Sequence, residues 1–313
     1  MRTLITGGAG FQGSHIVEQC LLDGHEVAIL NTFSEEAKRV TDLFSGDVSV
    51  VWGSVTDPEI VKKTLRGQDV VIHLAARINV DESIAAPSSF LHTNLTGTYN
   101  VLEGVREQAC RLIYASSCEV YGSVGPTPAG EESALRPHSS YAASKAAADL
   151  LCSAYRKTYG IDVTILRPCN IFGPRQKSGS GGAVIPIFVH RALAGKPLVV
   201  YGTGEQRREY MYVDDLVAAY KLVLDRVDIQ DEVINVATGE SPSIREIAEY
   251  IGERLSAPVE YGHSRPGEVM GFELDSGRAA RLGFSPKVSF WNGLRKYMRW
   301  AEETQVSSPG HQQ

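Results

Sequence analysis

The sequence predicts an α/β protein built on a doubly wound parallel sheet, followed by a smaller C-terminal α/β domain. Short apolar runs without polar alternation, such as residues 2–6 and 112–115, are separated by segments in which apolar residues recur at helical spacing. Continuous apolar strands that alternate with helices are typical of a parallel sheet covered on both faces. A glycine-rich stretch between the first strand and the first helix is a second sign of this fold.

The expected elements of the first half follow in order along the chain. Strands are predicted at residues 2–6, 26–30, 48–53, 69–76, 111–117 and 162–168, and helices at 11–24, 87–108 and 140–160. The first helix stops at Gly24, because glycine readily adopts the backbone conformation that ends a helix.

The composition of the chain changes after Pro168. A Gly/Ser-rich loop at 175–186 is followed by predicted helices at 185–197, 244–255 and 290–304, with short strands and turns at 198–216. We assign residues 1–168 to the first domain, to which 211–237 return, residues 169–210 and 238–303 to the second, and 304–313 to a flexible tail. A cleft between two such domains is the usual place for a small ligand.

Charge and cysteine content exclude several classes of function. The chain has 313 residues and a net charge of -6, which gives no basic footprint for nucleic acid or an anionic membrane. No apolar run approaches the ~20 residues of a membrane-spanning helix, and the first strand leaves no room for a signal peptide. Five scattered cysteines without a C-x-x-C pair argue against disulfides and zinc. We therefore expect a cytoplasmic protein without a metal site.

The glycine turn is the first candidate binding site. Gly7, Gly10 and Gly13 stand between a strand and a helix, where glycine allows a tight turn and close backbone approach. The positive end of the helix then faces an anion, which suits the pyrophosphate of a dinucleotide in a Rossmann domain.

The second strand bears on the choice of dinucleotide. An acidic residue commonly ends it and binds the adenosine ribose, but this chain has Asn31. Asparagine can hydrogen-bond hydroxyls but does not repel a 2′-phosphate, and Lys38 and Arg39 nearby could meet one. We favour NAD over NADP. Asp57 either approaches the adenine or caps the helix that starts at Pro58.

Tyr141 and Lys145 are the first candidate catalytic residues. Four residues apart on a helix, they share one face, and an ammonium beside a phenol is expected to lower the pKa of that phenol. Such a tyrosine can take a proton from an alcohol or sugar hydroxyl while hydride leaves for a nicotinamide. Ser117, 24 residues upstream at a strand end, completes the group.

Several motifs in order make the chain similar to a known family. The motifs are "TGGAGFQG", "VIHLAA", "NLTGTYNVLE", "SSCEVYG", "YAASK", "RPCNIFGPRQ", "VYGTGEQRREYMYVDDL" and "RPGEV". The chain resembles the extended short-chain dehydrogenase/reductases, in the nucleotide-sugar epimerase and dehydratase group, up to about residue 300. The resemblance implies a Rossmann domain that holds NAD and a C-terminal substrate-binding domain.

The resemblance also implies a set of site residues. The cofactor would contact Gly7, Gly10, Phe11, Gln12, Gly13, Asn31, Ser34, Ser54, Val55, Leu74, Ala75, Ala76, Asn94, Tyr141, Lys145 and Pro168. A nucleotide-diphosphate sugar would contact Asn170, Val184, Val200, Tyr201, Arg208, Arg265 and Glu268. Arginine suits a diphosphate because its planar fork can chelate phosphate oxygens. Two plainer alternatives stay open: Arg207 and Arg208 as solvated charges, and His73 as a buried, hydrogen-bonded histidine.

Cys118 and Glu119 follow Ser117 directly. In the resemblance, 4,6-dehydratases carry an acid–glutamate pair here, usually with aspartate as the acid, whereas 4-epimerases carry small or neutral residues. A similar Cys-Glu pair occurs in the tunicamycin-pathway 5,6-dehydratase. Once sugar C4 is a ketone, the C5 proton is acidic, and glutamate (reference pKa about 4.3) is ionised and can remove it. Cys118 (about 8.5) is protonated and is either the acid or a small buried filler.

These residues favour a NAD-dependent nucleotide-hexose dehydratase acting on a UDP- or dTDP-hexose through a 4-keto intermediate. A 4-epimerase is the alternative, followed by a UDP-glucuronate decarboxylase, and return of hydride to C4 or to C6 is left open. A non-catalytic dinucleotide sensor of this fold would lose the Tyr–Lys pair, which this chain keeps. The apolar helices at 88–108 and 140–160 lead us to expect a homodimer.

Overall fold

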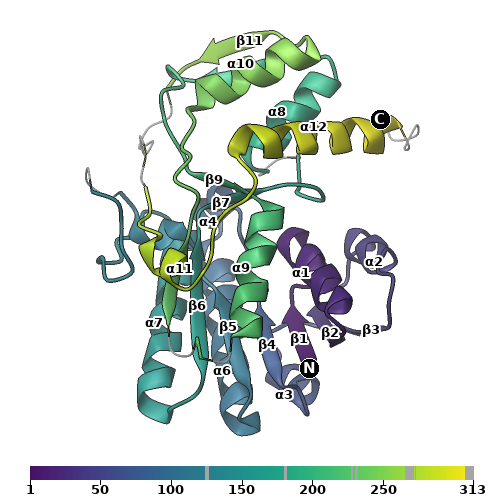
Figure 1. Ribbon diagram of the computed structural model, residues 1–313, viewed down its shortest axis with the longest axis vertical. Coiled ribbons are helices and arrows are strands. Elements are labelled where there is room, and N and C mark those ends of the chain that lie inside the picture. The colour runs from purple at the N-terminus through teal and green to yellow at the C-terminus, as the bar shows by residue number, and fades with distance from the viewer. Residues whose placement is uncertain are drawn as a thin grey trace.

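The computed structural model describes residues 1–123, 127–179, 182–226, 228–229, 232–264, 271 and 273–306. A parallel sheet with helices on both faces forms the larger part, and a smaller group of helices and strands lies over the carboxyl ends of its strands (Figure 1). No helix within these ranges is long and apolar enough to cross a membrane.

Seven parallel strands form the central sheet. They are β1 (Arg2–Thr6), β2 (Glu26–Asn31), β3 (Val48–Trp52), β4 (Val70–His73), β5 (Arg111–Ala115), β6 (Val163–Pro168) and β10 (Val233–Val236), in the order β10-β6-β5-β4-β1-β2-β3. The chain runs outward in both directions from β1, where Leu4 pairs with Ala28 of β2 and Val71 of β4. The predicted doubly wound sheet is confirmed, and the reversal at β1 and β4 is where such sheets bind ligands.

Helices cover both faces of this sheet. On one side lie α1 (Phe11–Leu22) and α9 (Val213–Asp225), and on the other α3 (Pro58–Leu65), α6 (Gly97–Gln108) and α7 (Ser140–Tyr159). The consecutive residues Leu4 and Ile5 are both fully buried, and they belong to two different hydrophobic clusters. Because neighbouring side chains of a strand point to opposite faces, a sheet covered twice requires apolar runs without alternation.

The predicted helix at 87–108 is interrupted. It consists of α5 (Pro87–Phe90), a π-helical turn η1 (Leu91–Thr96) and α6. Asn94 in η1 is buried, and its amide nitrogen donates to the Arg77 carbonyl at 2.9 Å and to Ser144 Oγ at 2.8 Å. π-Turns within helices often occur at functional sites, and this one turns a polar side chain toward α7.

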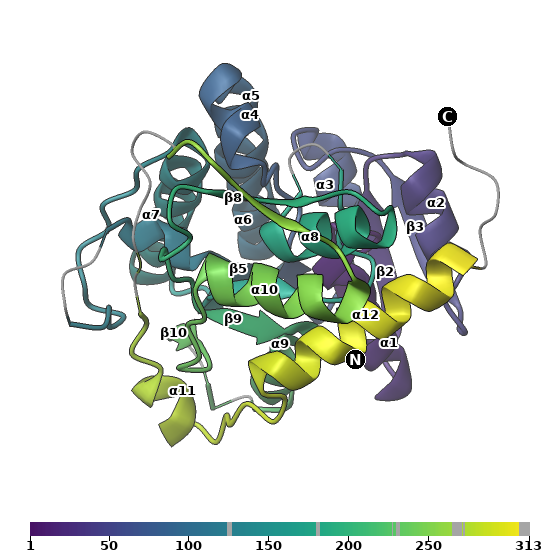
Figure 2. The same ribbon diagram turned by 90° about the horizontal axis from the view of Figure 1, so that it is seen from above.

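The smaller part is built on two short strand pairs. Its elements are β7 (Asn170–Phe172), α8 (Val184–Leu193), β8 (Leu198–Tyr201), β9 (Tyr210–Tyr212), α10 (Ile244–Leu255), β11 (Val259–Gly262) and α12 (Phe290–Val306). β7 pairs with β9 and β8 with β11, all parallel. Figure 2 shows α8, α10 and α12 lying over the end of the sheet. One hydrophobic cluster continues from the sheet into this part, so the two pack as one body.

The remaining helices are short. They are α2 (Glu35–Thr41), α4 (Val80–Ala85), the 3-10 turn η2 (Cys118–Tyr121) and α11 (Gly277–Arg281). Within the smaller part, the rings of Phe172, Tyr210, Tyr212 and Phe290 form a chain of contacts, with ring centroids 5.4–6.3 Å apart. β9 leads directly into α9, and the chain then returns to the sheet as β10.

Candidate active site

The residues that the sequence assigns to a site gather at one edge of the sheet. Gly7 follows β1, Asn31 ends β2, Ser54 lies just after β3, Leu74 follows β4 and Ser117 lies just after β5. Because all strands are parallel, their carboxyl ends share an edge, and this edge faces the smaller part of the molecule (Figure 1). The strand topology therefore brings together residues that are up to 110 positions apart (117 − 7).

The glycine turn requires its glycines. Gly7 has φ +75°, and a Cβ there would lie 2.9 Å from the backbone nitrogen of Ala75. A Cβ on Gly13 would lie 2.2 Å from the carbonyl oxygen of Gly7. Both contacts are shorter than packed atoms allow, so the loop after β4 and the start of α1 can approach only glycine here.

The start of α1 fits the pyrophosphate of a dinucleotide. Gly10 is the N-cap and supplies no side-chain hydrogen bond, and Ser14 is the first residue of the helix whose N–H bonds back, to Gly10 at 2.9 Å. The N–H groups of the three residues from Phe11 to Gly13 therefore take no part in the bonds of the helix. Exposed N–H groups at the positive end of a helix bind anions.

Polar residues lie at the end of β2 and in the segments that follow β2 and β3. The Asn31 carboxamide oxygen accepts from the Ala9 N–H at 3.3 Å, so Asn31 lies against the glycine turn. Ser34 caps α2, and Asp57 accepts from two N–H groups of α3 at 3.0 and 3.2 Å. The helix-cap interpretation of Asp57 is thereby confirmed. Lys38 forms an ion pair with Asp42, four residues further along the chain.

Three candidate residues meet at the junction of β5 and α7. The side chain of Ser117 lies close enough to the Tyr141 hydroxyl to lower the pKa of that hydroxyl. The Lys145 ammonium donates to the Ala115 carbonyl and lies 4.6 Å from the centroid of the Tyr114 ring. Lys145 is only 5% exposed. The structure thus brings Ser117, Tyr141 and Lys145 together, as the spacing on the helix predicted.

The expected pKa shift of Tyr141 is wrong for this structure. Burial raises the pKa of Tyr141, and the nearby Ser117 side chain only partly opposes this. Burial also lowers the pKa of Lys145 to about 8. Both shifts have one cause, since a buried site disfavours the charged form of each group. Lys145 bonds to a backbone carbonyl here instead of stabilising a phenolate.

Glu119 lies on the turn η2, next to this group. The Glu119 N–H donates to Ser117 Oγ at 3.2 Å, so the candidate catalytic hydroxyl also caps the turn. The carboxylate is partly buried, and burial raises its pKa although Arg208 and His138 nearby act in the opposite direction. Gly122 ends the turn with φ +64°, where a Cβ would lie 1.8 Å from the Arg136 carbonyl oxygen.

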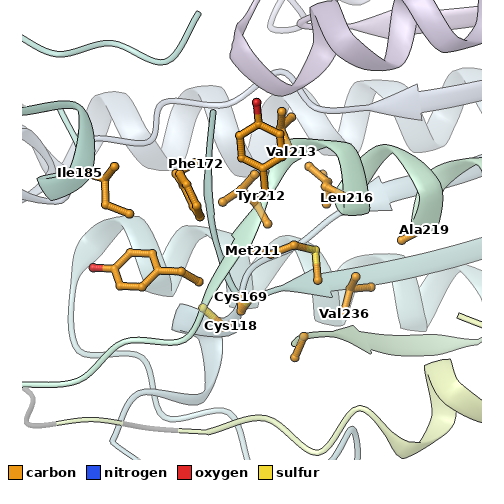
Figure 3. Packing of buried hydrophobic residues seen from close by; sticks show 14 of the residues in the cluster. Cys118, Cys169, Phe172, Ile185, Met211, Tyr212, Val213, Leu216, Ala219 and Val236 are labelled. Carbon is orange, nitrogen blue, oxygen red and sulfur yellow. The ribbon is translucent and has the colours of Figure 1, made fainter. Parts of the chain in front are cut away.

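Cys118 points into the hydrophobic interior. It is 2% exposed and belongs to the cluster that contains Cys169 and Met211, as Figure 3 shows. Burial raises the pKa of its thiol well above the ordinary value. This placement favours the filler interpretation over a role as an acid, because a proton donor must reach its acceptor.

His73 and Asn94 lie behind the loop that follows β4. His73 is 1% exposed and bonds to Thr6 Oγ1 at 2.6 Å and to Thr98 Oγ1 at 3.0 Å, so it is the buried, hydrogen-bonded histidine that the sequence allowed. Burial lowers its pKa to about 3. Leu74, Ala75 and Ala76 are partly buried, whereas Val55 and Pro168 are buried.

The residues expected to hold a nucleotide sugar are spread over the smaller part. Asn170 at the start of β7 donates to the Glu209 carbonyl at 3.0 Å, and Arg208 donates to the Arg207 carbonyl at 2.8 Å. Tyr201 is 38% exposed, whereas Val200 beside it is fully buried. Val184 begins α8. Arg265 and Glu268 lie outside the described residues.

Sequence reasoning missed several polar residues beside the site. Glu209 is fully buried and accepts from the N–H groups of Thr238 and Leu274 at 2.9 and 3.2 Å, which joins two segments of the smaller part. Asp149 lies four residues after Lys145 on the same helix face, a spacing that could have identified it. Arg167, its partner in an ion pair, carries no such local signal.

No group of three or more potential ligand side chains that could hold a metal ion occurs within the part of the chain that the structure describes. The site is therefore composed of hydroxyls, a lysine, a carboxylate and arginines beside an anion-binding turn. Such a set can move a proton from a hydroxyl, remove a proton next to a carbonyl and bind a diphosphate.

Comparison with known proteins gives consistent relatives. Residues 3–237 match the family model "NAD dependent epimerase/dehydratase family". A dTDP-glucose 4,6-dehydratase from Streptomyces niveus is 34% identical over 98% of this chain and 94% of its own length. Similarity to a relative establishes the family and leaves the individual reaction to be tested.

Two solved structures share the fold over nearly the whole chain. DesIV, a dTDP-glucose 4,6-dehydratase from Streptomyces venezuelae solved with NAD, has a TM-score of 0.91 and 36% identity, covering 98% of both chains. A UDP-glucose 4-epimerase from Thermotoga maritima, solved with UDP-glucose, has a TM-score of 0.88 and 30% identity, covering 97% of this chain and all of its own. Together with the glycine turn and the Ser117, Tyr141 and Lys145 group, these matches show that the chain is an enzyme of the NAD-dependent nucleotide-sugar epimerase/dehydratase family.

Proposed function

We propose that this enzyme is a nucleotide-hexose dehydratase that acts through a 4-keto sugar and removes water across C5 and C6. The observation that carries the proposal is the position of Glu119, which is partly buried and lies two residues after Ser117. Its backbone N–H donates to Ser117 Oγ at 3.2 Å, beside Tyr141. A 4-epimerase needs no carboxylate at that position.

The chain's own residues divide the proton transfers between them. NAD, for which the glycine turn provides a fitting anion site, takes hydride from sugar C4 and later returns it. Tyr141 accepts the proton of the C4 hydroxyl in its phenolate form, which burial disfavours and the Ser117 side chain beside it favours. Lys145 adds a positive charge on the same helix face. Glu119 then takes the C5 proton, and the electron pair of that C–H bond forms the C5–C6 double bond. The C6 hydroxyl leaves as water with the proton that Glu119 passes on to it.

The raised pKa of Glu119 suits this task. A carboxylate takes up a carbon-bound proton more readily when its pKa is closer to the working pH. Burial raises the pKa of Glu119, and the charges of Arg208 and His138 oppose this shift. Cys118 is protonated under the same conditions, but its burial supports a packing role.

The substrate we propose is a UDP- or dTDP-hexose. Asn170 lies on β7, and Arg208 lies just before β9. The Arg208 charge also acts on Glu119. A guanidinium there can bind the diphosphate with the sugar directed toward Tyr141. Arg265 and Glu268 complete the set by the family resemblance alone.

A 4-epimerase is the second candidate. The burial of Cys118 favours it, since the turn then offers a base without an accessible acid of its own. In that case Ser117, Tyr141 and Lys145 suffice and Glu119 has no chemical role. A UDP-glucuronate decarboxylase is a third candidate with no observation that favours it over these two.

The deciding experiment is Glu119→Gln, with Glu132→Gln as the control. The Glu132 side chain is 90% exposed and pairs with Arg278 on the surface. With an active nucleotide-hexose, Glu119→Gln should accumulate reduced nicotinamide but release dehydrated sugar about 10²–10⁴-fold more slowly, because an amide cannot take the C5 proton. Exchange of the C5 hydrogen with deuterated solvent should fall equally.

The matched outcomes separate the candidates. Glu132→Gln should behave as the wild type, and a wild-type rate for Glu119→Gln would put the epimerase first. The active sugar is found by mass spectrometry on a panel of UDP-, dTDP- and GDP-hexoses. Loss of one water indicates dehydration, an unchanged mass with a new isomer indicates epimerisation, and loss of carbon dioxide indicates decarboxylation.

We also propose that the enzyme is a homodimer. Large apolar side chains are exposed along η1, α6 and α7, namely Leu91 (45%), Tyr99 (45%), Leu150 (58%) and Tyr159 (52%). Apolar side chains gathered on neighbouring helices are typical of a subunit interface. A light-scattering mass of one chain at micromolar concentration would contradict this assignment.

A further inference from the structure

A chain of buried polar side chains lies beneath the turn η2, and the proposed chemistry does not use it. We define this relay by Ser116, Asp149, Arg167, Tyr121 and Asn235, each of which is at most 5% exposed. They come from five different places: the end of β5, α7, β6, the turn η2 and β10.

The contacts of the relay are short and continuous. Ser116 Oγ donates to Asp149 at 2.6 Å, and the Arg167 guanidinium binds both Asp149 oxygens at 2.8 and 2.9 Å. Arg167 also donates to the Tyr121 hydroxyl at 2.8 Å, which donates to Asn235 Oδ1 at 2.7 Å. The Asn235 amide nitrogen ends the relay on the carbonyls of Ala129 and Asp275, at 2.8 and 3.0 Å.

The relay is continuous with the candidate catalytic group through α7. Tyr141, Lys145 and Asp149 follow each other at four-residue spacing and so share one face of the helix. Each lies at the end of β5: Tyr141 is beside Ser117, Lys145 donates to the carbonyl of residue 115, and Asp149 accepts from Ser116. Asp149 is therefore the third residue of α7 that lies against the end of β5.

The other side of the relay supports the turn that carries Glu119. Tyr121 is the last residue of η2 and is 1% exposed, and its ring lies 5.1 Å from the Arg167 guanidinium. Arg167 and Asn235 are paired residues of neighbouring strands, so the sheet register sets the distance between the two partners of the Tyr121 hydroxyl. Both ends of η2, Ser117 and Tyr121, are thus held by hydrogen bonds.

A buried ion pair is a weak source of stability, because desolvation of both charges offsets their attraction. Arg167 and Asp149 are 5% and 0% exposed, and an apolar pair of similar volume would serve a purely structural purpose as well. Hydrogen bonds with fixed directions do what apolar contacts cannot: they set the orientation of the groups they join. Here those groups are the strand end and the turn of the candidate active site.

We propose that Arg167, Asp149 and Tyr121 are positioning residues for the reaction, which fix η2 so that Glu119 and Ser117 keep their alignment with Tyr141. The inference rests on the proposed function only for the role of Glu119. Small misplacement of reacting groups lowers turnover while the parts of the site that bind the nucleotide are unaffected. The relay should therefore act on kcat and leave KM unchanged.

The test is Tyr121→Phe, which removes one hydroxyl from the relay. The matched control is Tyr220→Phe, since Tyr220 on α9 is fully buried and its hydroxyl has no hydrogen-bond partner among the described residues. Tyr121→Phe should lower kcat roughly 10- to 100-fold with KM within about twofold. Its bound NAD should match that of Tyr220→Phe, which should keep the wild-type kcat. Its thermal midpoint should be lower than that of Tyr220→Phe, because Asn235 Oδ1 loses a buried hydrogen bond.

Ser116→Ala tests the opposite end of the relay and should show the same fall in kcat if Tyr121→Phe does not fold. A wild-type kcat in either folded variant would overturn the inference. A fall in kcat together with a rise in KM and a loss of bound NAD would overturn it as well. Glu119→Gln measured alongside separates the two proposals. If it is fully active while Tyr121→Phe is slow, the dehydratase assignment fails and the relay stands; the reverse pattern rejects the relay.

Discussion

The two halves of the candidate site, the oxidation group and the Glu119 turn, are held in different ways. Tyr141 and Lys145 are aligned by the repeat of one helix, and Ser117 follows the strand that this helix packs against. Glu119 lies on a single 3-10 turn whose neighbours, Arg208 and His138, come from other parts of the chain.

This difference fits the proposed division of roles between the two halves. Relatives named as dehydratases and as epimerases share the fold over nearly the whole chain. The reaction that follows oxidation is expected to depend on the turn, where a residue change needs no change of the sheet. A locally built group can thus be kept constant while a group assembled by distant contacts varies.

Tyr141→Phe should have the largest effect, because it removes the base of the first step. With an active sugar we expect hydride transfer to fall about 10³- to 10⁴-fold, so that neither reduced nicotinamide nor C5 exchange is seen. Tyr155→Phe on the same helix is the control, since its hydroxyl donates to Glu103 outside the site. Appreciable nicotinamide reduction by Tyr141→Phe would show that Tyr141 is not required for the oxidation step.

Arg208→Gln should have a smaller effect than Tyr141→Phe, and it should weaken binding of the nucleotide sugar. A hydrogen bond to a charged group contributes about 1.5–3 kcal/mol, so we expect KM for the nucleotide sugar to rise roughly 10- to 100-fold. The neighbouring Arg207→Gln is the control, because Arg207 is exposed and pairs with Glu246 on the surface. Equal KM values for the two variants would show that Arg208 does not bind the diphosphate.

The smallest effect concerns His73, the buried histidine behind the loop that follows β4. His73 has a pKa of about 3 in the folded protein, lowered by burial and then by the Lys145 charge, against 6.5 when exposed. Since the unfolded chain binds the proton first, this residue's contribution is complete above pH 6.5 and is lost as the pH falls from 6.5 toward about 3. The slope is about 1.4 kcal/mol per pH unit.

Urea unfolding at pH 7.5, 6 and 5 measures this slope. His73→Asn can keep hydrogen bonds to Thr6 and Thr98 and carries no titrating ring. The free energy of unfolding of the variant should therefore fall less steeply with acid than that of the wild type. Identical slopes would show that His73 is not the group that takes up the proton.

The sequence by itself determined the sheet, the glycine turn and the pairing of Tyr141 with Lys145. Apolar runs, a helix repeat and the requirement for glycine at a tight turn act over a few residues, so each is visible as a local pattern. The sequence also identified the residues at the strand ends, because the residues that follow the strands of a parallel sheet all lie at its carboxyl edge.

Only the tertiary structure decided how these residues are surrounded. It buried Cys118, placed Lys145 on the carbonyl of residue 115, and raised the pKa of Tyr141 where the sequence predicted the opposite. The relay joins Tyr121 to Asn235, 114 residues further along the chain. Burial and contacts of this kind depend on segments that meet only after the sheet has formed, and no local repeat in the chain encodes them.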